Sequence, residues 1–284
     1  MDLRHILAGA DESAAGREAV RTAVVLAGRA SARVTVLRTI VGAASAVHAV
    51  MGDGAGPDDG RGEVTRLRRW LGADLLTVPG GEPVHIDIGF GIPGIEICRY
   101  ADQFSIDLIV IGRKQRSQSA RMLIGDTADA VARRSQVPCL FVPPGQDDVR
   151  SLLVALDGTD RGLAVLRQAC AFAQSVGASL RVVTVERADA DEPGVLASRL
   201  PVARTSALEG RARGIIAQYD LPRTELIVRR GDVVAEVLTA MDTCAADTLV
   251  IGYHRGGPPG ILEAGSCARR LLHTTPSAVI TIPL

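Results

Sequence analysis

Two patterns of hydrophobic and polar positions alternate along the chain. Short runs such as residues 5–10 (HILAGA) and 107–112 (DLIVIG) are almost wholly apolar, whereas residues 13–30 place alanine, valine and leucine at helical spacing. Strands that are apolar throughout are buried on both faces, and their alternation with helices is typical of a parallel sheet covered by helices on both sides. The pattern therefore predicts an α/β fold.

The same reading predicts strands and helices in strict alternation over most of the chain. Residues 42–62 interrupt it with a glycine-rich segment that we expect to be irregular, and so do residues 188–200. Expected strands cover residues 5–10, 34–40, 84–88, 107–112, 139–143, 152–156, 181–185, 225–229, 247–252 and 278–283, and expected helices cover residues 13–30, 64–76, 92–104, 127–135, 204–219 and 234–245, with further helices starting at Asp160 and Ser266.

The chain also repeats itself. Residues 4–40 match residues 150–186 without a gap at an offset of 146, and residues 91–143 match residues 231–283 at an offset of 140. A period of this size corresponds to one ordinary domain rather than to a solenoid unit. The sequence thus predicts two tandem domains, over residues 1–146 and 147–284, in which each half serves as a control on the other.

Composition narrows the function. The net charge is zero, the pI is about 7.0 and aromatic residues make up only 3%, which argues against a nucleic-acid surface or an anionic membrane as partner. No apolar run approaches the length of a membrane span, so we expect a cytoplasmic protein. Lys114 is the only lysine and lies in Arg-Lys-Gln, which excludes a Walker A loop. Lysine-dependent Schiff-base chemistry would rest entirely on this one residue, and we set it aside as well.

The cysteines and histidines show no metal-ligand spacing. No C-x-x-C pair occurs, and four of the five cysteines align with apolar residues of the other repeat, which favours buried, reduced thiols and no metal site. The five cysteines are Cys98, Cys139, Cys170, Cys244 and Cys267.

Residues 89–94 match the pattern G-x-G-x-x-G between an expected strand and an expected helix, as in dinucleotide-binding folds. The second repeat tests this match, because it has Arg229 and Val234 at the outer positions and keeps only Gly231 in the middle. We therefore interpret Gly91 as a tight strand-to-helix turn rather than as part of a site for NAD or FAD.

A stronger candidate site lies at the carboxyl ends of the first and fourth strands of the second repeat. Gly252 and Gly265-Ser266 bracket a loop rich in glycine and proline that runs into a helix, where exposed amides can hold an anion. Asp157 ends the first strand and could accept a hydrogen bond from an exocyclic amine, or it could merely cap the next helix, with Ser266 capping the fourth. In the first repeat the cap is Ser13 or Asp11.

These features resemble the universal stress protein family, in which an Asp-Gly-Ser/Thr turn follows strand one and G-x2-G-x9-G-[ST] follows strand four. The resemblance covers nearly the whole chain, once per half. It implies two Rossmann-like domains, each with a five-stranded parallel sheet and helices on both faces, packed as a pseudo-dimer whose closing strands cover each other. For one branch of the family it further implies ATP, accompanied by Mg²⁺, in the second repeat, on Asp157, Val185, Ile251, Gly252, Gly265, Ser266 and Cys267.

The first repeat departs from the family pattern. Glu12 and Gln115 replace glycines, and Asp126 replaces the serine, which places a negative charge where phosphates would lie. Two charges about 4 Å apart repel by about 4 kcal/mol at an effective dielectric of 20. We therefore expect a degenerate site in the first repeat, formed by Asp11, Thr39, Gly112, Gly125 and Thr127. In the second repeat Arg255 stands at one glycine position, where it either pairs with a phosphate or blocks the loop.

Three functions remain open at this point. The first is an ATP-binding stress-response regulator without dedicated catalytic machinery. The second is a member of the same family that binds no nucleotide and acts through an unknown protein partner or a homodimer. The third is a weak nucleotide hydrolase, for which only Asp126, in the degenerate repeat, offers a carboxylate near the phosphates.

Overall fold

The computed structural model describes residues 3–41, 61–113, 125–186, 199–222, 224–254 and 266–284. Most of the segment predicted to be irregular, residues 42–62, lies outside these ranges, as do Arg255, Gly265 and Gln115. The first repeat consists of β1 (His5–Ala10), α1 (Ala14–Ala30), β2 (Arg33–Ile40), α3 (Arg61–Leu71), a 3-10 turn η1 (Ala73–Leu75), β3 (His85–Phe90), α4 (Pro93–Gln103), β4 (Leu108–Gly112), α5 (Asp126–Arg134) and β5 (Cys139–Val142).

The second repeat follows the same order of elements, and its bounds agree with the predicted strands and helices to within a few residues. It consists of β6 (Ser151–Leu156), α6 (Asp160–Val176), β7 (Ser179–Glu186), α7 (Arg199–Ile216), β8 (Glu225–Arg230), α8 (Val233–Thr243), β9 (Thr248–Tyr253), α9 (Ser266–Thr274) and β10 (Ala278–Pro283).

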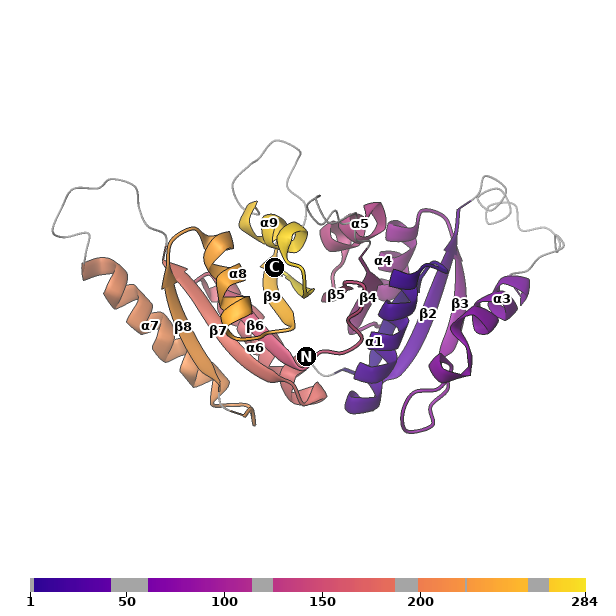
Figure 1. Cartoon of the computed structure of the whole chain (residues 1–284), viewed down its shortest axis with the longest axis horizontal. Coiled ribbons are helices and arrows are strands. Elements are labelled where there is room, and N and C mark those ends of the chain that lie inside the picture. The colour runs from indigo at the N-terminus through magenta and orange to yellow at the C-terminus, as the bar shows by residue number, and fades with distance from the viewer. Residues whose placement is uncertain (1–2, 42–60, 114–124, 187–198, 223, 255–265) are drawn as a thin grey trace.

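All ten of these strands form one sheet in the order β3-β2-β1-β4-β5-β10-β9-β6-β7-β8 (Figure 1). Strands are parallel within each repeat, and β5 and β10 pair antiparallel across the boundary, with Leu140 opposite Ile280 and Phe141 opposite Val279. The predicted α/β class and parallel sheets are confirmed. So is the expectation that the closing strands cover each other, which leaves neither as an open edge.

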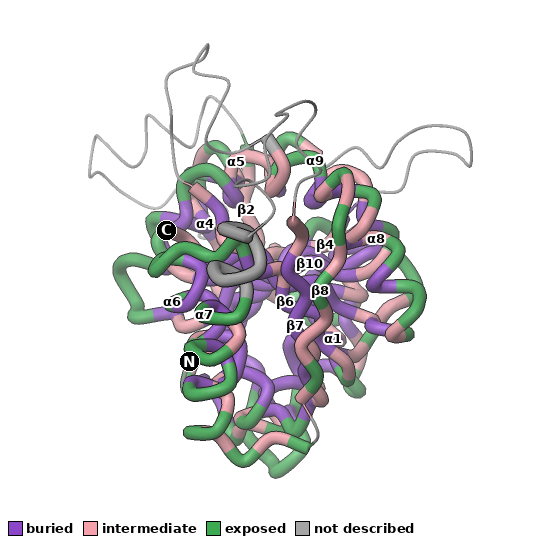
Figure 2. The backbone as a smooth tube through the Cα atoms, turned by 90° about the vertical axis from the view of Figure 1, so that its left-hand side faces the viewer, coloured by how far each residue is buried: buried purple, intermediate pink, exposed green. Residues whose placement is uncertain are grey.

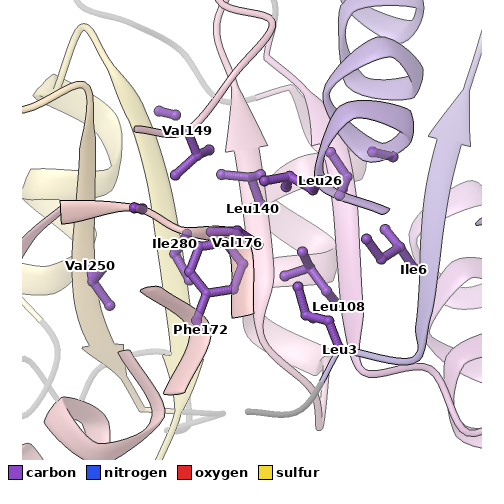
Figure 3. Packing of buried hydrophobic residues seen from close by; sticks show 14 of the residues in the cluster. Leu3, Ile6, Leu26, Leu108, Leu140, Val149, Phe172, Val176, Val250 and Ile280 are labelled. Atoms are coloured by element: carbon purple, nitrogen blue, oxygen red, sulfur yellow. The ribbon is translucent and has the colours of Figure 1, made fainter. Parts of the chain in front are cut away.

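Each face of the sheet has a core that runs through both repeats. Side chains alternate between the faces along the seam strands, so Leu140 and Ile280 belong to one core while Phe141 and Val279 belong to the other. Helices α1 and α6 pack on the first face and contact each other, and Leu26, Phe172 and Val176 from these helices meet the seam strands there (Figure 3). The strands are mostly buried, and exposed residues lie on the outer sides of the helices (Figure 2).

A short polar side chain caps the helix that follows the first strand of each repeat. Ser13 Oγ accepts from the amide of Gly16 at 3.1 Å at the start of α1, and Thr159 Oγ1 accepts from the amide of Gly162 at 3.0 Å at the start of α6. Of the two caps considered for the first helix, Ser13 is therefore the right one and Asp11 is wrong. Asp157 does not cap α6 either, because its carboxylate accepts from Thr159 rather than from the first amides of the helix.

Candidate functional site

A pocket of about 390 Å³ opens at the carboxyl ends of β6, β7 and β9 in the second repeat. β6 and β9 are neighbours in the sheet, and the chain runs from β6 toward β7 but from β9 toward β10, in the opposite direction. Such switch points are where α/β sheets bind ligands. Its walls come from these strand ends and from the first turns of α6, α8 and α9. Of the residues predicted for this site, the pocket is lined by Asp157, Val185, Ile251, Gly252 and Cys267.

The other predicted residues of this site have no described side chains. Arg255 and Gly265 lie outside the described ranges, and Ser266 is the first residue of α9, so only its place in the backbone is known. The start of α9 at Ser266 agrees with the prediction of a helix that begins there. Helix α9 therefore presents its N-terminal end to the pocket, through Cys267 and Ala268.

The first repeat has a smaller pocket, about 270 Å³, at the equivalent switch point. Every residue predicted there lines it, and Asp126, predicted as the residue that spoils the site, lines it as well. Glu12 does not belong to its lining, because its Oε2 accepts from Arg66 Nη2 at 2.8 Å. The predicted residues that line this pocket are Asp11, Thr39, Gly112, Gly125 and Thr127.

The turn after the first strand fixes the aspartate in both repeats. Asp157 Oδ1 accepts from the amide of Thr159 at 3.0 Å and from its hydroxyl at 2.8 Å, so the threonine that caps α6 also orients the carboxylate. A side chain at Gly162 would overlap Asp157 Oδ1, which explains the glycine in the first turn of α6. In the first repeat Ser13 donates to Asp11 Oδ1 in the same way, and the absence of a side chain at Gly16 leaves space for this carboxylate.

The glycines at the ends of the fourth strands, Gly112 and Gly252, are packed differently in the two repeats. A Cβ at Gly112 would overlap the backbone carbonyl of Ala15, so close packing of α1 on β4 requires glycine there. A Cβ at Gly252 would come 2.8 Å from Leu284 Cδ1 and 3.1 Å from Val165 Cγ2, which are side-chain atoms rather than backbone. Gly112, predicted as a ligand residue, thus has a packing role whatever the pocket holds.

The G-x-G-x-x-G match is a turn, as interpreted. Gly91 has φ +136° and Gly231 has φ +148°, a region that favours glycine, and each lies against a glutamate, Glu96 or Glu236. Gly94, the last glycine of the match, makes room for Ala130 of α5 instead of facing a ligand.

Sequence reasoning missed part of the wall of the larger pocket. His254 follows β9 and Leu284 follows β10, while Val233 and Val237 come from the first turns of α8. The duplication offered one signal, since Val233 and Val237 occupy the positions of Pro93 and Ile97, which line the smaller pocket. The contributions of His254 and Leu284 depend on how the chain folds back, and no sequence pattern marks them.

The thiols agree largely with the prediction. Burial raises the pKa of Cys98 to about 11 and those of Cys139 and Cys170 to about 12, so these three remain protonated and inert. Cys244 and Cys267 are partly exposed, and Cys267 faces the pocket.

Within the described ranges no group of three or more histidine, cysteine or acidic side chains is arranged to hold a metal ion. None of the helices described is both long and apolar enough to cross a bilayer.

Comparisons with known proteins agree with this architecture. A solved universal stress protein from Archaeoglobus fulgidus superposes with a TM-score of 0.69 at 16% identity, covering 98% of both chains, and one from Pseudomonas aeruginosa gives the same TM-score over 99% of this chain and 93% of its own. A universal stress protein of Mycobacterium tuberculosis is 24% identical over 235 residues, 78% of this chain and 77% of its own length. The model of the universal stress protein family matches twice, over residues 2–143 and 149–283. This chain is therefore a tandem member of the universal stress protein family.

Proposed function

We propose that the second repeat binds an adenine nucleotide, ATP in the first place, and that the protein acts as an ATP-binding stress-response regulator in the cytoplasm. The observation that carries this proposal is the convergence of the predicted residues. Asp157, Val185, Gly252 and Cys267 come from four different segments, three strand ends and the start of α9, and line one pocket. Its volume, about 390 Å³, falls within the range of about 300–1,000 Å³ that ligand pockets span.

The chemistry of the wall fits the parts of a nucleotide. Val183, Val185 and Ile251 offer an apolar surface for adenine, and the carboxylate of Asp157 is an acceptor for its exocyclic amine. The first turn of α9 contains no acidic residue, so its free amides and its dipole suit phosphate groups. ATP would bring Mg²⁺ with it, and this chain would supply orientation and exclusion of water rather than a general base.

The first repeat offers a poorer site. Its pocket, about 270 Å³, falls below the usual range, and α5 opens with Asp126 and Asp129 in its first turn. Carboxylates there compete for the same amides that phosphates would need. We therefore assign ATP to the second repeat and leave the first as a degenerate site.

One observation favours a second function, binding of a protein partner or a second copy without nucleotide. Phe90 is 43% exposed and Ile92 is 61% exposed in the first repeat, where the second repeat has Arg230 and Asp232. In this alternative the two exposed apolar side chains, which the second repeat replaces with charged ones, form part of the interaction surface. This alternative also explains why the first pocket can lose its ligand groups.

Mass spectrometry of protein denatured directly after purification separates the two functions, because a retained adenine nucleotide supports the first. Calorimetry then locates the site. Asp157→Ala should weaken ATP binding about ten- to a hundredfold, as expected for a lost hydrogen bond to a charged group. Asp11→Ala is the matched control, since it removes the same turn contacts in the other repeat. Equal ATP affinity in both variants and the wild type would contradict the proposal.

A further inference from the structure

The largest fully buried side chain of the described residues is a charged one, Arg113, which is 1% exposed and follows β4 at the seam between the repeats. Its described partners are all main-chain carbonyls of the second repeat. Nη1 donates to Leu272 O at 2.9 Å, and Nη2 donates to Thr275 O at 2.6 Å and to Ser277 O at 3.0 Å. A residue of the first repeat thus holds the end of α9.

The sequence explains why α9 needs this contact. The carbonyl of Leu272 would normally accept from the amide four residues later, but that residue is Pro276, which has no N–H. Arg113 supplies the missing donor, and its charge lies at the C-terminal end of the helix, where the dipole favours a cation. In the first repeat Gln136 stands at the position of Pro276, and Tyr253 of the second repeat stands at the position of Arg113. Among the residues that the structure describes, the anchor therefore runs from the first repeat to the second without a counterpart.

The other end of α9 forms part of the larger pocket. Cys267, Ala268 and Leu271 line it from this helix, which has nine residues and so spans only about 13 Å from end to end. The helices α5 and α9 lie beside each other above the seam (Figure 1), and His273 Nε2 is 3.9 Å from Asp129 Oδ1 between them. A shift of α9 at its anchored end must therefore move the pocket wall.

We infer that Arg113 is a positioning residue for the nucleotide site of the opposite repeat: it fixes α9 so that the first turn of that helix closes the pocket around Asp157 and Gly252. This inference rests on the proposed function for the ligand, although the anchor itself can be tested without one. The first repeat then contributes to binding in the second repeat without holding a ligand itself.

Arg113→Met removes the three hydrogen bonds and keeps an apolar stem of similar length. Arg29→Met is the matched control, because Arg29 also crosses the repeats, to the carbonyl of Val149 at 3.0 Å, but does not contact α9. The first measurement is the rate at which N-ethylmaleimide labels Cys267 in protein without ligand, with Cys244 as internal reference. We expect Arg113→Met to change the ratio of the two rates at least threefold and Arg29→Met to leave it unchanged.

The second measurement is ATP affinity by calorimetry. Arg113→Met should bind about tenfold more weakly, which corresponds to ~1.4 kcal/mol, and Arg113→Lys should fall between, because it keeps the charge but loses the planar fork of donors. If Arg113→Met does not fold, Arg113→Lys decides with the same two measurements.

The outcomes are distinct. If wild-type protein binds no ATP while the labelling of Cys267 still changes in Arg113→Met, the proposed function fails and the anchor of α9 stands. If wild-type protein binds ATP and the variants keep wild-type affinity, the inference is overturned, whatever the labelling shows. If Arg113→Met and Arg113→Lys both label Cys267 at the wild-type rate, the inference is overturned as well.

Discussion

The two repeats share the turn after their first strand and differ at the helix that closes the pocket. Asp11 with Ser13 and Asp157 with Thr159 form the same hydrogen-bonded turn, which leads into the first helix of each half. In contrast, α5 opens with Asp126 and Asp129, whereas α9 has no acidic residue in its first turn. Contacts that build the fold have thus been kept in both halves, and charges that face the pocket have diverged. The fold does not require both pockets to bind the same ligand.

The seam is where both repeats depend on each other most, so its disruption should have the largest effect. Phe141 is fully buried in β5 and pairs with Val279 of β10. Phe141→Ala should lower the free energy of unfolding by about 3–5 kcal/mol, because it leaves a cavity in a core that spans both repeats. Denaturant titration measures this loss.

Phe104→Ala is the matched control for the seam variant, since Phe104 is 43% exposed and packs only on Tyr100 among the described rings. We expect a loss of about 1 kcal/mol or less there, as for most exposed positions. Comparable losses for the two variants would mean that the seam is not a common core.

The glycines at the fourth strand ends offer a direct comparison of the repeats. Gly112→Ala should destabilise the protein by about 3 kcal/mol, because the methyl group would overlap the rigid backbone of Ala15. Gly252→Ala should cost about 1 kcal/mol, since the side chain of Leu284 can turn aside and that of Val165 must give by only a few tenths of an ångström. Thermal unfolding of both variants checks the order, and a larger loss for Gly252→Ala would show that the packing difference is misassigned.

The sequence alone predicts features that depend on local patterns, but not those that depend on contacts between distant segments. Local patterns predicted the element order, and the bounds of β1 and β10 agree residue for residue, because apolar runs and the duplication both mark them. The turn aspartates and the strand-end glycines were found because each lies at the end of a recognisable strand. Arg113 was not found, since its burial depends on a helix more than 150 residues away, and His254 and Leu284 reach the pocket only through the tertiary fold.

Removing an acidic side chain from the first pocket should have a smaller effect, a modest rise in the affinity of that pocket for ATP. Asp126→Ser removes one exposed carboxylate beside the start of α5. A unit charge about 4 Å away contributes about 1 kcal/mol in water, so we expect ATP affinity at the first site to rise about fivefold and to stay below that of the second site. Calorimetry in the Asp157→Ala background isolates the first site. An affinity there equal to that of the intact second site would contradict the assignment of a degenerate pocket.

Two partly buried histidines, His5 and His273, are expected to make the stability of the fold depend on pH. Burial is the main cause that lowers the pKa of His5 below its usual 6.5, and Arg33 adds to this, while Asp107 opposes it. Burial likewise lowers the pKa of His273 below 6.5, with Arg269 and Arg113 adding to this and Asp129 opposing it. The second repeat has Ser151 at the position of His5, and the first has Arg133 at the position of His273. Each repeat therefore carries one such group that the other lacks.

The smallest predicted effect follows from these two groups. Because each histidine has a lower pKa in the folded than in the unfolded state, the unfolded chain binds the proton first as the pH falls below about 6.5. The histidine contribution is therefore neutral above that pH and destabilising below it. His5→Ser, which copies the second repeat, loses the hydrogen bond to Thr35 at every pH, but its free energy of unfolding should fall less steeply between pH 7 and pH 5 than that of the wild type. Denaturant titrations across this range measure the slope of the free energy of unfolding against pH, and His85→Ser, at an exposed position on β3, serves as control.

If that slope is as steep for His5→Ser as for the wild type, His5 is excluded as a source of the acid sensitivity. His273, at the contact between α5 and α9, is then the remaining candidate of the pair.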